Sequence, residues 1–207
     1  MPRFCFIEPC QPVLRDRPPK GADWIHEVKF DGYRVQLHKQ GEATAVLSRN
    51  GFDFTNRYST IARALTNVPS KSVILDGELI ASSVEGIPEF YALHLRSKRL
   101  PPGRLCVWVF DVLELNGADL RSEPLVKRRR HLEGLMRKVE PSAIRLSETF
   151  DDPERLLIAC EERGLEGIVS KRRAAPYVSG KTHSWIKVKC KAWRAANRER
   201  YKLFEAN

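Results

Sequence analysis

Seven short segments rich in β-branched and aromatic residues constrain the fold of this chain more than any other feature. They are residues 24–30, 33–39, 43–48, 72–81, 105–115, 167–171 and 185–189. Their length and composition favour strands over helices. Helical patterns fill intervals at residues 55–65, 88–95, 124–139 and 152–164, the last with Asp152 as its predicted N-cap and Gly164 at its end. Because strands and helices do not alternate regularly, the sequence predicts an α+β fold of antiparallel sheets flanked by helices.

The two ends of the chain differ in composition from its middle. Residues 1–22 hold five prolines and are predicted to form an extended lead-in. Residues 23–191 are long enough for one domain with its own core. Residues 192–207 are predicted to form a basic C-terminal helix, because aromatic and small residues recur on one face. We expect the aromatic face to pack on the domain.

Composition argues against several classes of protein. Hydrophobic residues make up 42% of the chain and charged residues 30%, as in ordinary globular proteins. No apolar run approaches the ~20 residues that span a membrane, and the start of the chain lacks a signal-peptide pattern. The five scattered cysteines form no C-x-x-C pair, so we expect reduced thiols, no zinc site and a cytoplasmic protein. Cys106 and Cys160 are predicted to be core residues.

A lysine motif, K-x-D-G-x-R at residues 29–34, joins the first two strand segments. A solvated lysine has a pKa near ~10.4, so at neutral pH it is protonated and cannot act as a nucleophile. Partial burial beside Val28 and Phe30, with other cations nearby, would lower that pKa. Arg34 can hold phosphate oxygens with its planar donors, and Gly32 permits a positive φ or a close backbone approach. A surface lysine entering a turn is the alternative for this motif alone.

Further motifs follow in a fixed order. They are S-R-N-G-F at residues 48–52, D-G-E at 76–78, F-D at 110–111, E-G-I-V-x-K at 166–171 and K-V-K at 187–189. In order and spacing, the series resembles the nucleotidyltransferase motifs of ATP-dependent DNA ligases, in particular the ligase domain of bacterial end-joining enzymes. The resemblance runs from about Trp24 to Lys189. It implies an adenylation (nucleotidyltransferase) domain that uses ATP and Mg²⁺ to join DNA strand breaks in repair.

The resemblance also implies roles for individual residues. Lys29 would attack the α-phosphate of ATP, release pyrophosphate and hold AMP through a phosphoramidate bond. The AMP would pass to a DNA 5′-phosphate, and a 3′-hydroxyl would displace it. Glu166 and Glu78 resemble the metal-binding carboxylates, and Glu78 also meets the ribose, whereas Asp76 fits a structural role. The residues implied in nucleotide or DNA contact are Glu27 and Phe110 (adenine), Arg34 (ribose), Lys187 and Lys189 (α-phosphate) and Arg49 (DNA 5′-phosphate).

Several of these residues also have a structural interpretation. Lys187 and Lys189 alternate along a strand, so both ammonium groups lie on one face and would stabilise an anionic transition state. They would also depress the pKa of Lys29. An amphipathic edge strand explains K-V-K alone, a turn residue explains Glu166, and a core ring explains Phe110. The ordered set of motifs favours the functional interpretation.

Positive charge is concentrated at the C-terminal end. The formal net charge is +10, and from Gly167 onward eleven lysines and arginines face two glutamates. Such a region is the electrostatic footprint of a polyanion, although a solvated basic face is the alternative. Together with the motifs, it predicts nicked or broken double-stranded DNA as the partner of a monomeric, nucleoid-associated bacterial protein that does not contact membranes.

The chain departs from the ligase pattern after the K-V-K segment. Ligases continue there into an oligonucleotide-binding (OB) barrel that closes over ATP, whereas this chain ends about eighteen residues later. We therefore expect slow self-adenylylation but measurable sealing of pre-adenylylated nicks, with an OB-barrel protein or a repair factor acting in trans as a candidate partner. Two alternatives remain open: a ligase-derived DNA-end-binding module without turnover, and an RNA ligase or capping-type nucleotidyltransferase.

Overall fold

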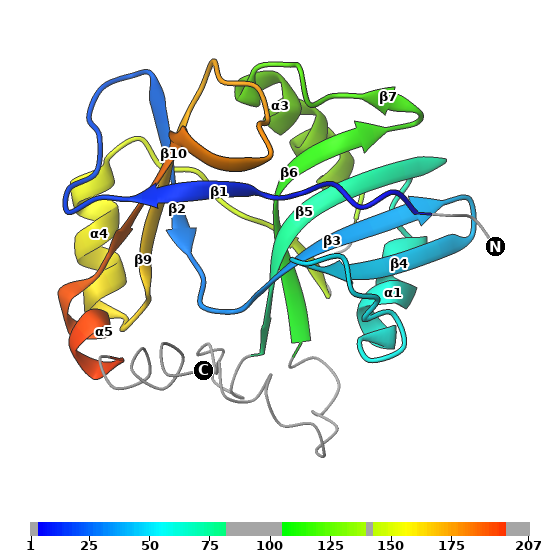
Figure 1. Cartoon of the computed structure of the whole chain (residues 1–207), viewed down its shortest axis with the longest axis horizontal. Helices are drawn as coiled ribbons and strands as arrows, with labels where there is room; N and C mark the ends of the chain where they lie inside the picture. Colours follow the sequence, from blue (N-terminus) through cyan, green and yellow to red (C-terminus); the bar gives the residue numbers. More distant parts are fainter. Residues whose placement is uncertain (1–3, 82–104, 140–142, 198–207) are drawn as a thin grey trace.

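Two β-sheets form the framework of the computed structural model, which describes residues 4–81, 105–139 and 143–197 (Figure 1). The first sheet has the order β1 (Cys10–Leu14), β10 (Gly180–Lys189), β9 (Gly167–Arg172) and β2 (Trp24–Lys29). The second sheet has the order β4 (Ala43–Ser48), β3 (Tyr33–Gln40), β5 (Ser72–Ala81), β6 (Leu105–Leu115) and β7 (Ala118–Asp119), and β8 (Ile144–Leu146) pairs with β6. The chain passes directly from the first sheet to the second at residues 30–32, inside the lysine motif.

Two strand pairs correct the prediction of purely antiparallel sheets. β1 pairs with β10 in parallel, and so does β8 with β6. The partners of β1 lie some 170 residues away in sequence, so no local turn signal announces this pairing. Pro12 is tolerated because β1 is an edge strand, and the register shifts immediately after it. β10 begins at Gly180, before the strand segment predicted at residues 185–189, and its added residues pair with β1.

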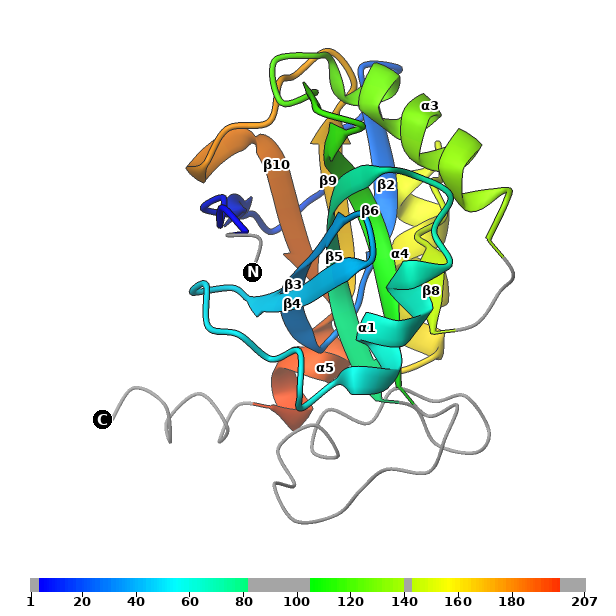
Figure 2. The ribbon, with the colours of Figure 1, turned by 90° about the vertical axis from the view of Figure 1, so that its right-hand side faces the viewer.

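Four helices pack against the sheets in the described ranges, three on the outer faces and one at the end of the first sheet (Figure 2). They are α1 (Ser59–Thr66), α3 (Leu125–Met136), α4 (Pro153–Glu162) and α5 (Lys191–Ala196). The Asp152 side chain accepts hydrogen bonds from the N–H groups of Glu154 and Arg155, which caps α4 as the sequence predicts. None of these helices is long and apolar enough to cross a bilayer.

The core is divided between the two sheets. The larger cluster packs α1 and α3 against the second sheet through residues such as Val35, Leu75 and Leu132. A second cluster joins α4 and α5 to the outer face of the first sheet through Leu156, Ile168 and Trp193. A third cluster, which includes Phe110, Tyr177 and Trp185, packs the inner faces of the two sheets against each other. Cys106 and Cys160 are buried free thiols, as predicted.

Most predicted elements are present, and some fall outside the described residues. The strand segments at 43–48, 72–81 and 105–115 coincide with β4, β5 and β6. The predicted helix at residues 88–95 lies outside the described residues. Of the predicted C-terminal helix, α5 is described to Ala196, and residues 198–207 are not described. The division into a lead-in, an adenylation domain and a basic tail stays a prediction.

Candidate active-site cleft

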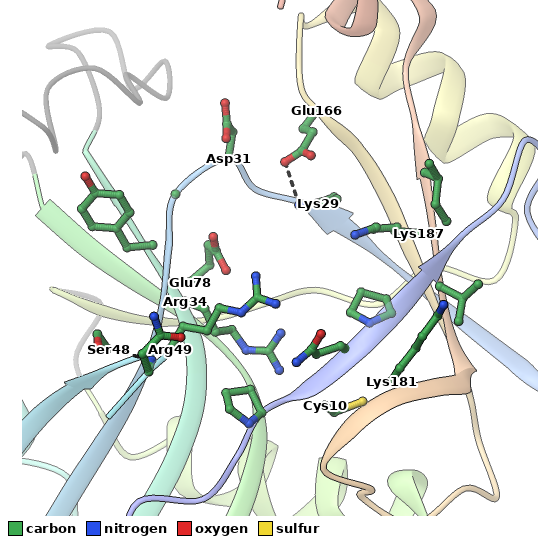
Figure 3. Close-up of a pocket in the computed structure, with 18 of the residues that line it drawn as sticks. Cys10, Lys29, Asp31, Arg34, Ser48, Arg49, Glu78, Glu166, Lys181 and Lys187 are labelled. Atoms are coloured by element: carbon green, nitrogen blue, oxygen red, sulfur yellow. Dashed lines mark hydrogen bonds and ion pairs between the residues drawn. The ribbon is translucent and has the colours of Figure 1, made fainter. Parts of the chain in front are cut away.

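A cleft of about 1010 Å³ opens between the two sheets (Figure 3). The loop that carries the lysine motif forms one end of it, and Glu78 on β5 and Glu166 before β9 project into it. Lys187 on β10 and Arg49, which follows β4, face it from opposite sheets. The structure therefore brings together residues that lie more than a hundred positions apart in the sequence.

At the centre of the cleft, one carboxylate bridges two ammonium groups. Lys29 Nζ donates to Glu166 Oε2 at 2.7 Å, and Lys189 Nζ lies 2.9 Å from Glu166 Oε1. Glu166 is only 4% exposed, so both contacts are shielded from water. Lys187 and Lys189 lie on the same face of β10, as predicted, because Val188 between them packs into the opposite core.

Two glycines allow the motif residues to approach one another. A Cβ atom on Gly32 would lie 2.2 Å from the carbonyl oxygen of Leu79, so only glycine lets the lysine loop pass against β5 beside Glu78. Gly167 has a φ of +148°, and a Cβ there would lie 2.0 Å from the carbonyl oxygen of Val188. This contact between β9 and β10 holds Glu166 within reach of Lys189. Close packing against the backbone of β5 therefore explains the glycine at position 32.

The pKa of Lys29 is raised, which corrects the prediction that neighbouring cations would lower it. Burial favours the neutral amine, but the charges of Glu166, Glu78 and Asp31 together outweigh burial and raise the pKa. The sequence shows the cations of the K-V-K segment but not that Glu166 lies between them and Lys29. The pKa of Lys187, in contrast, is lowered by burial and by the charges of Lys29 and Lys189.

Glu78 shares the cleft with Glu166 and is strongly perturbed. Burial, opposed by Lys29 and Arg34 and reinforced by Glu166, raises the pKa of Glu78 to about 7. The described residues contain no group of three or more His, Cys, Asp or Glu side chains arranged around a metal ion. Magnesium, however, commonly uses one or two carboxylates together with phosphate oxygens and waters. Two mutually repelling carboxylates in a cleft fit that donor set.

Arg34 is held rigidly at the cleft wall. Its Nε and Nη2 atoms donate to the two oxygens of Asp76 at 2.7 and 2.8 Å. The Tyr177 hydroxyl donates to the same carboxylate at 2.6 Å and accepts from the Cys10 N–H. The guanidinium lies 4.7 Å from the centroid of the Phe110 ring. Asp76 therefore has a structural role, as expected, which is to orient Arg34.

Two residues predicted to contact adenine lie behind the cleft rather than on its surface. Phe110 is buried, and the ammonium of Lys171 sits 4.3 Å from its ring centroid. The buried Glu27 carboxylate accepts from Lys171 Nζ at 2.7 Å and from the Ser147 hydroxyl at 2.9 Å. Neither residue lines the cleft. Their contact with adenine stays a prediction drawn from the resemblance.

Several cleft residues were not predicted from the sequence. Residues 9–14 form one wall of the cleft beside β10. Just before them, the backbone of Ile7 is hydrogen-bonded to the Gln36 amide of the second sheet. Arg57, Lys181 and Trp193 also line the cleft. A cation facing a cleft has no sequence pattern that distinguishes it from a solvated one. The wall depends on the long-range β1–β10 pairing, which no local pattern signals.

Comparisons with known proteins point to one family. Residues 13–189 match the family model for the ATP-dependent DNA ligase domain. The multifunctional non-homologous end joining protein LigD of Pseudomonas aeruginosa is 35% identical over 186 residues, which is 89% of this chain and 22% of that protein. A probable DNA ligase of Dictyoglomus turgidum is 36% identical over 179 residues, covering 79% of this chain and 30% of the relative.

A solved structure is also similar to this chain over most of its length. The crystal structure of the ligase domain from M. tuberculosis LigD matches with a TM-score of 0.75 at 29% identity, over 87% of this chain and 60% of that one. The chain thus spans less than a third of the two curated relatives. The α+β nucleotidyltransferase fold is confirmed. Since the family model matches most of its length, the chain belongs to the family of ATP-dependent DNA ligase domains.

Proposed function

We propose that this chain is the catalytic domain of a DNA ligase, in which Lys29 takes AMP from ATP and passes it to a DNA 5′-phosphate. The observation that carries the proposal is the pairing of Lys29 and Lys189 with one buried carboxylate inside a cleft of a ligase-family domain. A lysine that is 21% exposed can be reached by a nucleotide, while its neighbours hold it in place.

The proposed reaction is an in-line phosphoryl transfer. The neutral Lys29 amine forms an N–P bond to the α-phosphate, the bond to pyrophosphate breaks, and the amine loses a proton. Lys187 and Lys189 stand beside Lys29 and Glu166, and in this proposal their charges stabilise the negative charge that accumulates on the α-phosphate. Glu166 and Glu78 are the candidates to hold Mg²⁺, which would neutralise phosphate charge. If Glu166 held a metal ion, Lys29 would lose the carboxylate that contributes most to its raised pKa.

Duplex DNA is the proposed acceptor of the AMP. Arg49, Arg57 and Lys181 line the cleft beside Lys187, so cations stand on both sheets around the proposed transfer site. A guanidinium such as that of Arg49 can hold a phosphate with two parallel hydrogen bonds. We propose a break with a 5′-phosphate as the substrate, because the second step requires that group.

The rate of AMP transfer to Lys29 should rise with pH. The raised pKa of Lys29 keeps the amine protonated at neutral pH, so the reactive fraction should grow about tenfold per pH unit below that pKa. The pKa of Glu78 is raised to about 7. Below pH 7 the rate should therefore fall more steeply, because a protonated Glu78 can no longer help to hold Mg²⁺. Rapid-quench measurement at ATP concentrations well below KM, from pH 6 to 9, tests this because it reports the pKa of Lys29 in the free protein, and tryptophan fluorescence confirms folding at each pH. A flat or falling profile would contradict it.

Binding to nicked DNA should weaken steeply as salt rises. Each phosphate neutralised contributes about 0.9 to the slope of log affinity against log salt. Replacing Arg49, Arg57 and Lys181 together with alanine should therefore reduce the slope by up to ~2.7. A matched control replaces the exposed Lys71, Lys127 and Arg130, which lie away from the cleft. An equal reduction of the salt-dependence slope in both triple variants would show that DNA binds by overall charge rather than at the cleft.

One gel experiment tests the proposed function as a whole. The chain is incubated with Mg²⁺ and ATP labelled on the α-phosphate, with and without nicked duplex. We expect labelled protein without DNA, and transfer of label to DNA followed by sealed product when the nick is present. DNA binding without any labelled protein would favour a DNA-end-binding module instead.

A further inference from the structure

Trp193 forms part of the cleft wall although it lies outside the residues that match the ligase family model. The match ends at Lys189, and Trp193 follows on α5. Its side chain is buried, and the indole is one of the surfaces that line the cleft. The Lys189 ammonium lies 4.4 Å from the indole ring centroid. Trp193 therefore contacts one of the three lysines around the proposed transfer site.

The helix that carries Trp193 is anchored on two sides. The Glu161 carboxylate of α4 accepts from the N–H groups of Lys191 and Ala192 at 3.0 and 2.7 Å. The Cys190 N–H donates to the backbone carbonyl of Glu166 at 2.9 Å. The first turn of α5 is thus tied both to α4 and to the residue that binds Lys29. Such anchoring leaves the indole little freedom to move.

The position of Lys189 between two different partners suggests what the indole does. Glu166 Oε1 lies 2.9 Å from the ammonium, and the centroid of the indole ring lies 4.4 Å from it. An aromatic face attracts a cation without adding a negative charge of its own. The ammonium can therefore stay at the cleft wall when the carboxylate takes another partner.

We propose that Trp193 is a positioning residue that holds the Lys189 ammonium in place for AMP transfer. The inference rests on the proposed function, in which Glu166 exchanges its lysine partners for a metal ion. At that moment Lys189 needs a second contact, or its long side chain gains rotamer freedom and moves away from the α-phosphate. The indole supplies that contact. The function of Trp193 thus goes beyond packing α5 on the domain.

The contact itself is tested without nucleotide. Lysines are dimethylated with ¹³C, and the Lys189 signal is assigned by its absence in Lys189→Arg. Ring current from the indole should shift this signal upfield in the wild-type chain, and Trp193→Leu should abolish the shift. Trp193→Phe should keep part of it. An unchanged Lys189 signal in Trp193→Leu would overturn the proposal.

The kinetic part of the test separates positioning from stability. Trp193→Leu should lower the maximal rate of AMP transfer to Lys29 about tenfold, with KM for ATP within about twofold, whereas Trp193→Phe should lose about threefold or less. Trp24→Leu is the control, because Trp24 is equally buried and has Arg172 5.2 Å from its ring centroid, away from the cleft. That variant should lose stability but not rate.

The outcomes distinguish this inference from the proposed function. Equal rate losses in Trp193→Leu and Trp193→Phe would overturn the positioning role, since the phenyl ring retains an aromatic face. If Trp193→Leu does not fold, the Trp193→Phe variant still tests the positioning role through its partial ring-current shift and its smaller loss of rate. Failure of the wild-type chain to accept AMP would overturn the proposed function, and the positioning role that rests on it, while the NMR result would still report whether Trp193 contacts Lys189.

Discussion

Replacing Lys29 with arginine should reduce covalent AMP formation by more than ~10³-fold, because a guanidinium stays protonated and cannot supply a lone pair. The substitution keeps the positive charge beside Glu166, so the fold and the ion pair should survive. Intact-protein mass spectrometry after incubation with ATP and Mg²⁺ measures the adduct directly.

Two matched substitutions show whether this loss is specific. Lys187→Arg keeps a cation near the proposed α-phosphate position and should cost no more than about tenfold. Lys20→Arg alters a lysine whose side chain is 73% exposed and should leave the yield of the AMP adduct unchanged. Adduct formation that persists in Lys29→Arg would place the nucleophile elsewhere, with Lys187 and Lys189 the next residues to map.

Replacing Gly167 with alanine should destabilise the protein by ~4 kcal/mol or more, a large fraction of the ~5–15 kcal/mol that stabilises an ordinary domain. The added Cβ would lie 2.0 Å from the Val188 carbonyl oxygen, and a φ of +148° is strained for any residue with a side chain. β9 would have to separate from β10, which carries Lys187 and Lys189. Thermal unfolding followed by circular dichroism measures the effect.

Gly134 provides the control for this substitution. It lies within α3, and a Cβ there would meet nothing within 4 Å. Gly134→Ala should therefore stabilise the helix by ~0.5–1 kcal/mol. A Gly167→Ala variant as stable as the wild type would show that β9 and β10 do not approach as closely as the structure has them.

The sequence was sufficient to predict the elements that carry the motifs. Strand periodicity and β-branched content located β4, β5 and β6, because these strands bury their side chains against one core. Asp152 and the glycine at position 164 marked the ends of α4 through local chemistry, since capping depends on residues a few positions apart. The ordered motifs then identified the family that the comparisons confirm.

The electrostatics of the cleft could not be predicted in the same way. The pKa of Lys29 depends on Glu166, which lies 137 residues away in sequence and reaches it through the β2–β9 pairing. The parallel contact of β1 with β10 likewise joins distant segments, so the wall formed by residues 9–14 was missed. Lys171 belongs to a recognised motif, yet its burial between Glu27 and Phe110 is visible only in the fold.

The most direct test of the central claim maps the position of AMP on the wild-type chain. The protein is incubated with ATP and Mg²⁺, digested under conditions that preserve the phosphoramidate bond, and sequenced by tandem mass spectrometry. We predict a single added AMP on the peptide that contains Lys29, and none on peptides that contain Lys187 or Lys189. AMP on another residue, or no adduct despite tight ATP binding, would contradict the proposal that this cleft performs lysine adenylylation.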